Sequence, residues 1–257
     1  MDSLLSPPYV HYASAYDGSG QIRFAILCHI YLRDLLAHHP VSGRRLLDMA
    51  CGTGTLALLM AGDGWDVTAL DRSAAMLAQA AAKLSPDQSV RLIEADMRQL
   101  PPELPAASFD LVTCTYDSLN YMLNTEELAA CFRAAAAALA PGGLYVADMN
   151  TRHFLEFDWG ECAVREQEGY IQIERSHFIA ETESSFMLLT GFVGDDEQGY
   201  LRFDEGHVER AYPAELVEGL LRSAGLQVEA TYDSFTLQSP GPETQRIFWV
   251  ARRGGEV

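Results

Sequence analysis

A glycine-rich turn between a short apolar segment and a helix-forming segment constrains the fold of this chain more than any other feature. The apolar segment is RLLDMA at residues 45–50, and the CGTGT turn that follows carries Gly52 and Gly54. Glycines let a backbone reverse sharply and approach a ligand closely, and ligands of open α/β sheets bind outside the carboxyl ends of the strands. The turn therefore predicts a ligand site at the edge of such a sheet.

Short apolar segments alternate with segments of helical periodicity on both sides of this turn. This order predicts an α/β protein with a doubly wound, mostly parallel, Rossmann-like seven-stranded sheet, because apolar strands are typical of parallel sheets covered on both faces. The predicted strands are residues 45–50, 66–70, 90–95, 109–115, 144–149, 226–235 and 246–251. The predicted helices are residues 21–39, 56–62, 73–84, 126–140 and 213–224.

Local signals mark several element ends. Ser73 and Thr125 are expected to cap helices, and Pro141-Gly142-Gly143 is expected to stop the helix before it. Residues 1–20, with two prolines and two glycines, are expected to form an irregular arm without helix.

The pattern changes to a period near two between residues 162 and 210. Alternating residues such as Ile171 and Ile173 share one face of a strand, and residues 194–199 are typical of a hairpin turn. We therefore expect an antiparallel β insertion of about four strands. Residues 1–151 and 211–257 would form one core, and residues 152–210 a lid over a substrate pocket.

The chain is strongly acidic, which limits its partners. Asp and Glu total 36 against 18 Lys and Arg, so that the formal net charge is −18 over 257 residues. Such a surface repels phosphate backbones and anionic lipids, and we expect neither a nucleic-acid nor a membrane partner. The charge leaves a small-molecule enzyme open. We expect a monomer or a homodimer.

The apolar runs and the cysteines indicate a cytoplasmic protein. No run approaches the roughly 20 residues of a membrane helix, and the N-terminus lacks the pattern of a signal peptide. The five cysteines are widely spaced without a C-x-x-C pair, so we expect free thiols and no metal site.

Acidic residues at three predicted strand ends indicate the ligand. Asp71 lies nineteen residues after Gly52, where a carboxylate can accept hydrogen bonds from two ribose hydroxyls. Asp96 can accept an adenine amino proton, and Met97 can pack on the ring. Asp48, just before the turn, would repel a dinucleotide pyrophosphate and attract an ammonium group, as in the methionine end of S-adenosylmethionine.

Five segments resemble motifs of the class I S-adenosylmethionine-dependent methyltransferases. These segments are LLDMACGTGTLAL, VTALDRSAAML, EADMRQL, FDLVTCTYDSLNYM and PGGLYVADMN. The resemblance covers nearly everything from about Tyr16 to Arg252, and it implies S-adenosyl-L-methionine as the cofactor. The cofactor contacts it implies are Tyr16, Asp48, Ala50, Cys51, Gly52, Gly54, Asp71, Arg72, Met76, Asp96, Met97, Arg98 and Thr115.

A narrower resemblance points to methyltransferases of small molecules. The Tyr16-Asp17 pair, residues 116–121 and the β insertion are similar to those of glycine N-methyltransferase and the amino-sugar N,N-dimethyltransferases. We therefore expect methyl transfer to a nitrogen or oxygen of a small acceptor. The expected acceptor contacts are Tyr116, Asp117, Asn120, Tyr121, His207 and Arg210, and the catalytic candidates are His207, Tyr16 and Asp117.

Other interpretations remain open at this stage. Gly52-x-Gly54-x-x-Ala57 also fits a nicotinamide-dependent oxidoreductase, and the fold could serve a non-catalytic S-adenosylmethionine-binding module or act on a protein substrate. Structural roles are the alternatives for Asp48, Asp96, Tyr16, Asp117, Asn120 and His207.

Overall fold

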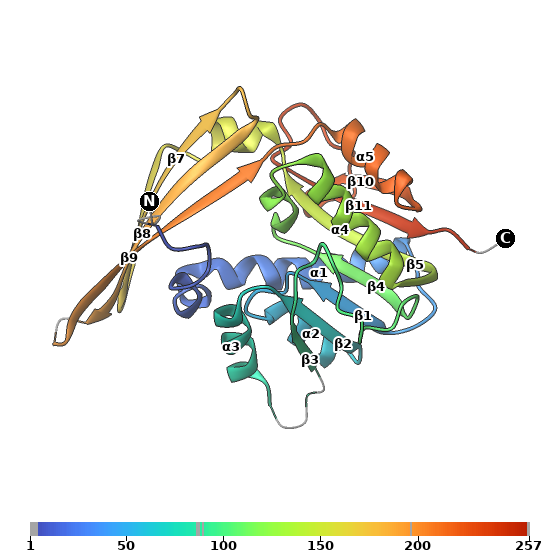
Figure 1. Ribbon diagram of the computed structural model, residues 1–257, viewed down its shortest axis with the longest axis horizontal. Helices are drawn as coiled ribbons and strands as arrows, with labels where there is room; N and C mark the ends of the chain where they lie inside the picture. Colours follow the sequence, from blue (N-terminus) through green and yellow to red (C-terminus); the bar gives the residue numbers. More distant parts are fainter. Residues whose placement is uncertain (1–4, 86–87, 89, 196, 256–257) are drawn as a thin grey trace.

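A seven-stranded sheet forms the centre of the protein. The structure, a computed structural model, describes residues 5–85, 88, 90–195 and 197–255. The strand order is β10 (Leu226–Asp233), β11 (Arg246–Arg253), β5 (Leu139–Asn150), β4 (Phe109–Cys114), β1 (Arg45–Met49), β2 (Asp66–Asp71) and β3 (Val90–Glu94) (Figure 1). Neighbouring strands from β5 to β3 are parallel, and β11 is antiparallel to both β10 and β5. The expected mostly parallel sheet is confirmed.

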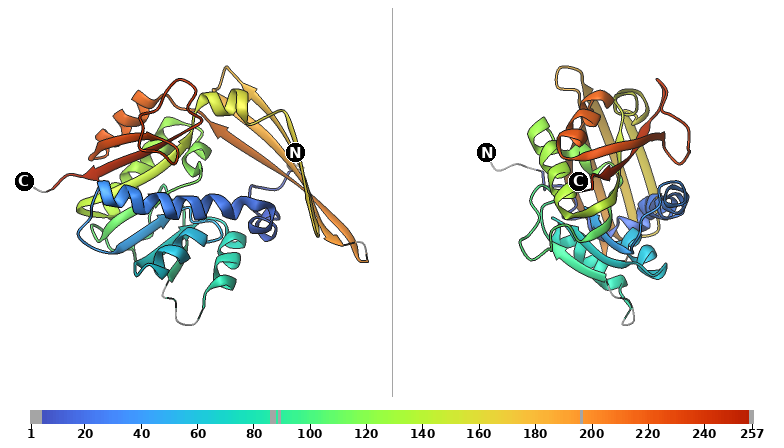
Figure 2. Two further views of the ribbon diagram at one scale, coloured as in Figure 1. Left: turned by 180° about the vertical axis from the view of Figure 1, so that it is seen from behind. Right: turned by 90° about the vertical axis from the view of Figure 1, so that its right-hand side faces the viewer.

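Helices cover both faces of this sheet. Successive side chains of a strand point to opposite faces, so Leu46 and Leu47 of β1 belong to different buried clusters. The Leu46 face is covered by α1 (Ile22–His38), which runs across it in Figure 2, and by α2 (Thr55–Gly62). The Leu47 face is covered by α4 (Thr125–Ala138) and α5 (Ala214–Ser223). This packing makes the strand ends a rigid platform.

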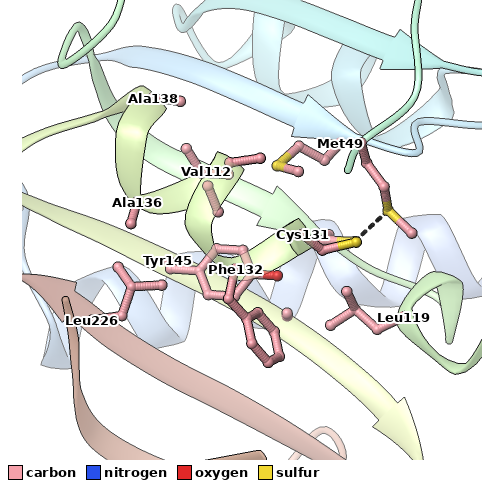
Figure 3. Close-up of a cluster of buried hydrophobic side chains, with 14 of the residues drawn as sticks. Met49, Val112, Leu119, Cys131, Phe132, Ala136, Ala138, Tyr145 and Leu226 are labelled. Carbon is pink, nitrogen blue, oxygen red and sulfur yellow. Dashed lines mark hydrogen bonds between the residues drawn. The ribbon is translucent and has the colours of Figure 1, made fainter. Parts of the chain in front are cut away.

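Aromatic and aliphatic side chains fill the layer between α4 and the sheet (Figure 3). Phe132 of α4 and Tyr145 of β5 lie edge to face, with ring centroids 6.1 Å apart. Both side chains are fully buried, and burial of the Phe132 ring contributes roughly 1.5–3 kcal/mol.

Most helix and strand ends lie where the sequence predicts them. The predictions for Thr125 and for residues 141–143 were wrong. Ser73 caps α3 (Ala74–Lys83) by accepting the Met76 N–H at 3.3 Å, as expected. The cap of α4 is Asn124 instead of Thr125, because Asn124 has extended dihedral angles and accepts the Glu127 N–H at 2.9 Å. Residues 141–143 do not stop α4, which ends at Ala138; they interrupt the pairing of β5 with β4.

Residues 1–20 were expected to contain no helix, and this was wrong in part. Short helical turns span Tyr12–Ser14 and Asp17–Gln21, and the second leads into α1 through Gly20 at φ +96°. The arm continues along the second sheet, where Ser6 donates its N–H to the Asp204 carbonyl at 3.1 Å.

The second sheet is antiparallel, with the order β6 (Cys162–Gln167), β7 (Tyr170–Ile179), β8 (Ser184–Asp195) and β9 (Gly199–Arg210). It leaves the central sheet after β5 and returns to it before α5, which confirms the expected antiparallel insertion. The expected turn at 194–199 joins β8 to β9, and residue 196 lies outside the described residues. Among the described residues, no helix has the length and apolar character needed to span a bilayer.

Candidate active site

Two adjoining pockets lie beside the carboxyl ends of the parallel strands. The first, here named the strand-end pocket, has an empty volume of about 1050 Å³ and is lined by Asp48, Gly52 and Asp71 among others. The second, named the insert pocket, has an empty volume of about 1440 Å³ and reaches β7, β8 and β9. A common wall borders both pockets; its side chains are Tyr9, Tyr16, Gln21, Phe24, Tyr116 and Tyr121. A ligand in one pocket would therefore lie next to a ligand in the other.

The glycine turn has left-handed backbone conformations at three positions. Ala50, Gly52 and Gly54 have φ values of 56°, 55° and 72°. A Cβ added to Gly52 would meet no described atom within 4 Å, so this glycine keeps the strand-end pocket open. A Cβ on Gly54 would lie 2.8 Å from Ala80 Cβ, so this glycine allows α2 to begin against α3. Gly54, a predicted cofactor contact, lies outside the described pocket lining.

Asp71 links the end of β2 to the turn. Its carboxylate oxygens accept the N–H groups of Gly52 and Ser73, both at 2.8 Å. Burial raises the pKa of Asp71 although these bonds oppose the shift. Each oxygen can accept a further hydrogen bond, and Asp71 lines the strand-end pocket, which suits a pair of ribose hydroxyls.

Asp48 is the other buried acid of this pocket. It is 2% exposed, and its Oδ1 accepts the Thr113 hydroxyl at 2.7 Å. Its Oδ2 has no hydrogen-bond partner among the described residues. Burial raises the pKa of Asp48 to about 7. An unpartnered buried carboxylate oxygen calls for a donor, preferably a cationic one.

Asp96 and Arg98 form a local ion pair. Arg98 Nη2 lies 2.6 Å from Asp96 Oδ2, and this guanidinium lowers the pKa of Asp96. Asp96 and Met97 line the strand-end pocket, whereas Arg98 lies outside its described lining and also pairs with Glu127. The position of Arg98 favours a supporting role over a direct cofactor contact. The other predicted cofactor contacts in the described lining are Tyr16, Ala50, Cys51, Arg72, Met76 and Thr115.

The insert pocket contains most of the predicted acceptor contacts. Tyr116, Asp117, Tyr121 and His207 line it. His207 is 1% exposed and reaches the pocket from β9. The sequence had indicated these residues by their position after a strand or within the insertion, and the structure brings them together.

Asn120 and Arg210 lie outside the described linings of both pockets. The Asn120 amide donates to the carbonyls of Asn150 at 3.0 Å and Arg210 at 2.9 Å, and it accepts the Asn150 N–H at 2.9 Å. Arg210 donates to the Leu123 carbonyl at 2.7 Å. These bonds hold the end of β9 against the core, and this placement favours structural roles.

The sequence analysis missed a buried arginine, Arg246. Its Nη2 lies 2.7 Å from Asp117 Oδ1, its Nη1 contacts Asp148, and its guanidinium lies over the Phe24 ring, 4.6 Å from the centroid. Asp148 also accepts the N–H groups of Tyr116 and Asp117. Arg246 thus positions the segment that follows β4. No local motif marks it, since it follows Asp148 by 98 residues.

Glu209 of β9 is a second residue that the sequence analysis missed. It lines the insert pocket and accepts a hydrogen bond from the Asn150 side chain at 2.8 Å. Burial and the nearby Asp117 raise its pKa well above the usual range. The alternation of Glu205, His207 and Glu209 along β9 was the available signal, because side chains two apart share a face.

Asp17 fastens the N-terminal segment to the glycine turn. Its oxygens accept the Thr53 hydroxyl and the Lys83 ammonium, both at 2.6 Å. Lys83, the only lysine of the chain, also donates to the Thr55 hydroxyl at 2.8 Å. This contact places Tyr16 in the wall between the pockets.

A left-handed turn, a carboxylate at the next strand end and a buried acid with one unpartnered oxygen are features of an α/β protein suited to bind a nucleoside that carries a cation. Known proteins similar to this chain are methyltransferases. Residues 46–143 match the family described as a methyltransferase domain. A putative methyltransferase of Geobacillus sp. (strain WCH70) is 31% identical over 212 residues, which cover 82% of this chain and 85% of the relative.

A second relative and a solved structure support the same assignment. The dTDP-3-amino-3,6-dideoxy-alpha-D-glucopyranose N,N-dimethyltransferase of Streptomyces fradiae is 30% identical over 201 residues, which cover 77% of this chain and 76% of the relative. The crystal structure of an S-adenosylmethionine-dependent methyltransferase from Clostridium acetobutylicum ATCC 824 has a TM-score of 0.83 and 28% identity, covering 96% of this chain and 99% of that one. The chain belongs to the S-adenosylmethionine-dependent methyltransferases.

Proposed function

We propose that the protein methylates a nitrogen of a small amine held in the insert pocket. The observation that carries the proposal is the wall shared by the two pockets, because it sets an acceptor beside a donor bound at the strand ends. Residues 152–210 would form the roof of the acceptor site, and residues 1–151 with 211–257 the core.

The charge of the insert pocket supports an amine. Acidic side chains in its lining are Asp117, Asp158, Glu174 and Glu209, and the arginines are Arg165 and Arg246. Glu209 is neutral because of its raised pKa, but the other three acids still outnumber the two arginines, and an excess of carboxylates in a partly enclosed site attracts a cation. The Streptomyces fradiae relative is named for dimethylating an amino group of a sugar, which agrees with this acceptor class.

The residues of the strand-end pocket fit S-adenosylmethionine, which supplies an electrophilic methyl group when bound. Asp71 would hold the ribose hydroxyls, and Asp48 Oδ2 would accept from the ammonium. Met76 and Met97 would flank the adenine. Orientation and the exclusion of water are the main contributions expected of the protein, and they can supply ~7–11 kcal/mol of a barrier.

Three side chains are proposed to act near the reacting atoms. Tyr16 lies in the shared wall, and burial raises the pKa of its hydroxyl well above the usual range, so it stays neutral. Asp117 is held by Arg246 and would accept from the amine. His207 would take part in removing its proton.

Binding and methyl-transfer assays test the proposal. Calorimetry should show binding of S-adenosylmethionine and none of a nicotinamide dinucleotide. With methyl-labelled cofactor, amines and their hydroxyl analogues would be compared as matched pairs, such as glucosamine and glucose. We expect label in the amine; label only in the hydroxyl analogues would contradict the acceptor class.

A cytoplasmic location and a monomeric or homodimeric state are further proposals. The location is supported by the five cysteines, each of which is free in the described residues.

A further inference from the structure

Four side chains lie in a row that runs from buried positions on β9 to partly buried positions in the shared wall. The hydroxyls of Tyr9 and Tyr121 are 2.8 Å apart, and the Tyr121 hydroxyl lies 2.8 Å from His207 Nδ1. On the far side of the ring, His207 Nε2 lies 3.6 Å from Glu205 Oε2, which is an ion-pair distance longer than a hydrogen bond, and Nε2 has no hydrogen-bond partner among the described residues. His207 and Glu205 are 1% and 0% exposed, so solvent does not replace these contacts.

Glu205 also holds the N-terminal arm. Its carboxylate accepts backbone N–H groups from Tyr9 at 2.8 Å, His11 at 2.6 Å and Tyr12 at 3.0 Å. Burial alone would raise the pKa of Glu205, but the contacts with His207 and with these three amides outweigh it and lower the pKa. Glu205 is therefore an ionised, purely accepting group.

This charge favours one direction for the two hydrogen bonds of this row. A carboxylate attracts the positive N–H end of an imidazole, so the Nε2 atom that faces Glu205 carries the proton of a neutral His207, and Nδ1 is left as an acceptor. Tyr121 must then donate to Nδ1, and Tyr9 must donate to Tyr121. The Tyr9 oxygen keeps a lone pair in the wall between the two pockets.

We propose that Tyr9, Tyr121, His207 and Glu205 form a proton relay that accepts the proton of the methyl acceptor. The proposal rests on the methyltransferase function given above. The N–H bond of an ammonium acceptor breaks as its proton moves to Tyr9 Oη. The Tyr9 proton moves to Tyr121 and the Tyr121 proton to Nδ1. His207 becomes an imidazolium opposite the Glu205 carboxylate, and the amine keeps the electron pair that attacks the methyl carbon.

The surroundings suit transfer through the tyrosines. Burial raises the pKa values of Tyr9 and Tyr121 well above the usual range, so the hydroxyls pass a proton without holding a negative charge. The acids that act on these hydroxyls, Asp117 and Glu209, disfavour a tyrosinate further. Tyr9 would be the catalytic residue of this relay, because it lines both pockets and would contact the acceptor; Tyr121, His207 and Glu205 are positioning residues.

Nitrogen NMR of the histidine rings tests the direction of the relay without an acceptor. The protein would be saturated with S-adenosylhomocysteine at a pH above the usual range of histidine pKa values. The ring signals of His207 would be assigned by their absence from the spectrum of His207→Gln. We expect the Nε2–H tautomer of His207. The hydrogen bond from Tyr121 should shift the Nδ1 resonance in the wild type, and this shift should be lost in Tyr121→Phe. An Nδ1–H tautomer in the wild type would overturn the proposal.

Turnover of glucosamine tests the function of the relay. Removing one hydroxyl in Tyr9→Phe keeps the ring and the backbone N–H that Glu205 holds. We expect kcat to fall by about 100-fold, the lower end of general acid–base effects, while KM and cofactor affinity change little. We expect the wild type to have a lower kcat in D2O than in H2O, and this solvent isotope effect should disappear in Tyr9→Phe. Full kcat in Tyr9→Phe would refute the relay.

The chain offers a matched control outside both described pockets. The Tyr232 hydroxyl lies 3.0 Å from His39 Nε2, and His39 Nδ1 lies 2.7 Å from Glu229, so these residues repeat the same side-chain types. Tyr232→Phe should retain the wild-type kcat and isotope effect. If the wild type binds no S-adenosylmethionine, or methylates neither glucosamine nor any other amine, the proposed function fails. The tautomer of His207 is a separate result, because it tests the direction of the hydrogen bonds in the relay.

Discussion

Asp71 Oδ2 accepts the backbone N–H of Gly52 at 2.8 Å, and this bond couples the end of β2 to the glycine turn after β1. Asp71 ends β2 and Gly52 follows β1, and these two parallel strands have their carboxyl ends at one edge of the sheet. The carboxylate is therefore oriented before any ligand arrives, which reduces the ordering cost of binding.

Replacing Asp71 tests its proposed hold on the ribose. Hydrogen bonds to a charged group are worth about 1.5–3 kcal/mol each, so losing two should weaken S-adenosylmethionine binding at least about 100-fold. Calorimetry on Asp71→Ala measures this, and circular dichroism checks the fold. Asp66→Ala, at the exposed start of the same strand, is the control and should bind normally. Unchanged affinity in Asp71→Ala would remove it from the site.

The raised pKa of Asp48 predicts that the stability of the protein depends on pH. Its pKa rises to about 7 in the folded protein from about 4 in the unfolded chain, so the folded state holds a proton that the unfolded state releases between these values. The free energy of unfolding should therefore fall as pH rises from about 4 to 7, by up to about 4 kcal/mol. Urea unfolding across this range measures the change. Asp48→Asn should flatten this part of the profile, and an unaltered slope would contradict the assignment.

The same group predicts a pH dependence of cofactor binding. A cationic ligand beside Asp48 favours the ionised carboxylate, so affinity should rise as pH approaches about 7 and level off above it. Calorimetry over this range measures the effect, and Asp48→Asn should bind weakly with a smaller dependence. Affinity that falls with pH in the wild type would argue against an ammonium contact.

Alanine substitutions at Gly52 and Gly54 are expected to affect different properties, cofactor affinity at Gly52 and stability at Gly54. Both have positive φ, which costs an alanine about 1–2 kcal/mol. Gly54→Ala also places a Cβ 2.8 Å from Ala80 Cβ, so it should lose more stability, and Ala80→Gly should restore part of it. Gly52→Ala meets open space and should mainly reduce cofactor affinity. Urea unfolding and calorimetry separate the two; equal stability losses would contradict the difference.

Truncation of the Arg246 side chain is expected to lower the free energy of unfolding strongly. Arg246→Met leaves the buried Asp117 and Asp148 without their counter-charge, and breaking such a pair costs about 3–5 kcal/mol. Arg222→Met, which removes an exposed ion pair with Glu218, should cost under about 1 kcal/mol. Urea unfolding compares the two variants. A small effect at Arg246 would mean that the acids are neutral in the fold.

Much of the fold was predictable because its signals are local. The strand at Arg45–Met49, its glycine turn and the Ser73 cap depend on apolar pattern, backbone freedom and a side chain near its own helix. The cap of α4 was misplaced by one residue, because Asn124 and Thr125 are both good caps and only the backbone angles decide between them.

The candidate site was most predictable where a strand end places its residues. Asp48 and Asp71 entered the strand-end pocket as expected, since parallel strands bring their carboxyl ends together. Arg98, Asn120 and Arg210 lie outside the described pockets, because each found ionic or backbone partners that the sequence does not reveal.

The sequence by itself determined the sheet, the left-handed turn and the acids at its edge, because neighbouring residues and a repeating period specify them. Tertiary structure alone decided the wall between the pockets. Glu205 holds the Tyr9 N–H across 196 residues, and Arg246 reaches Asp148 across 98. Such contacts depend on how the insertion and the last strand fold back on the core, and no local pattern encodes that distance in space.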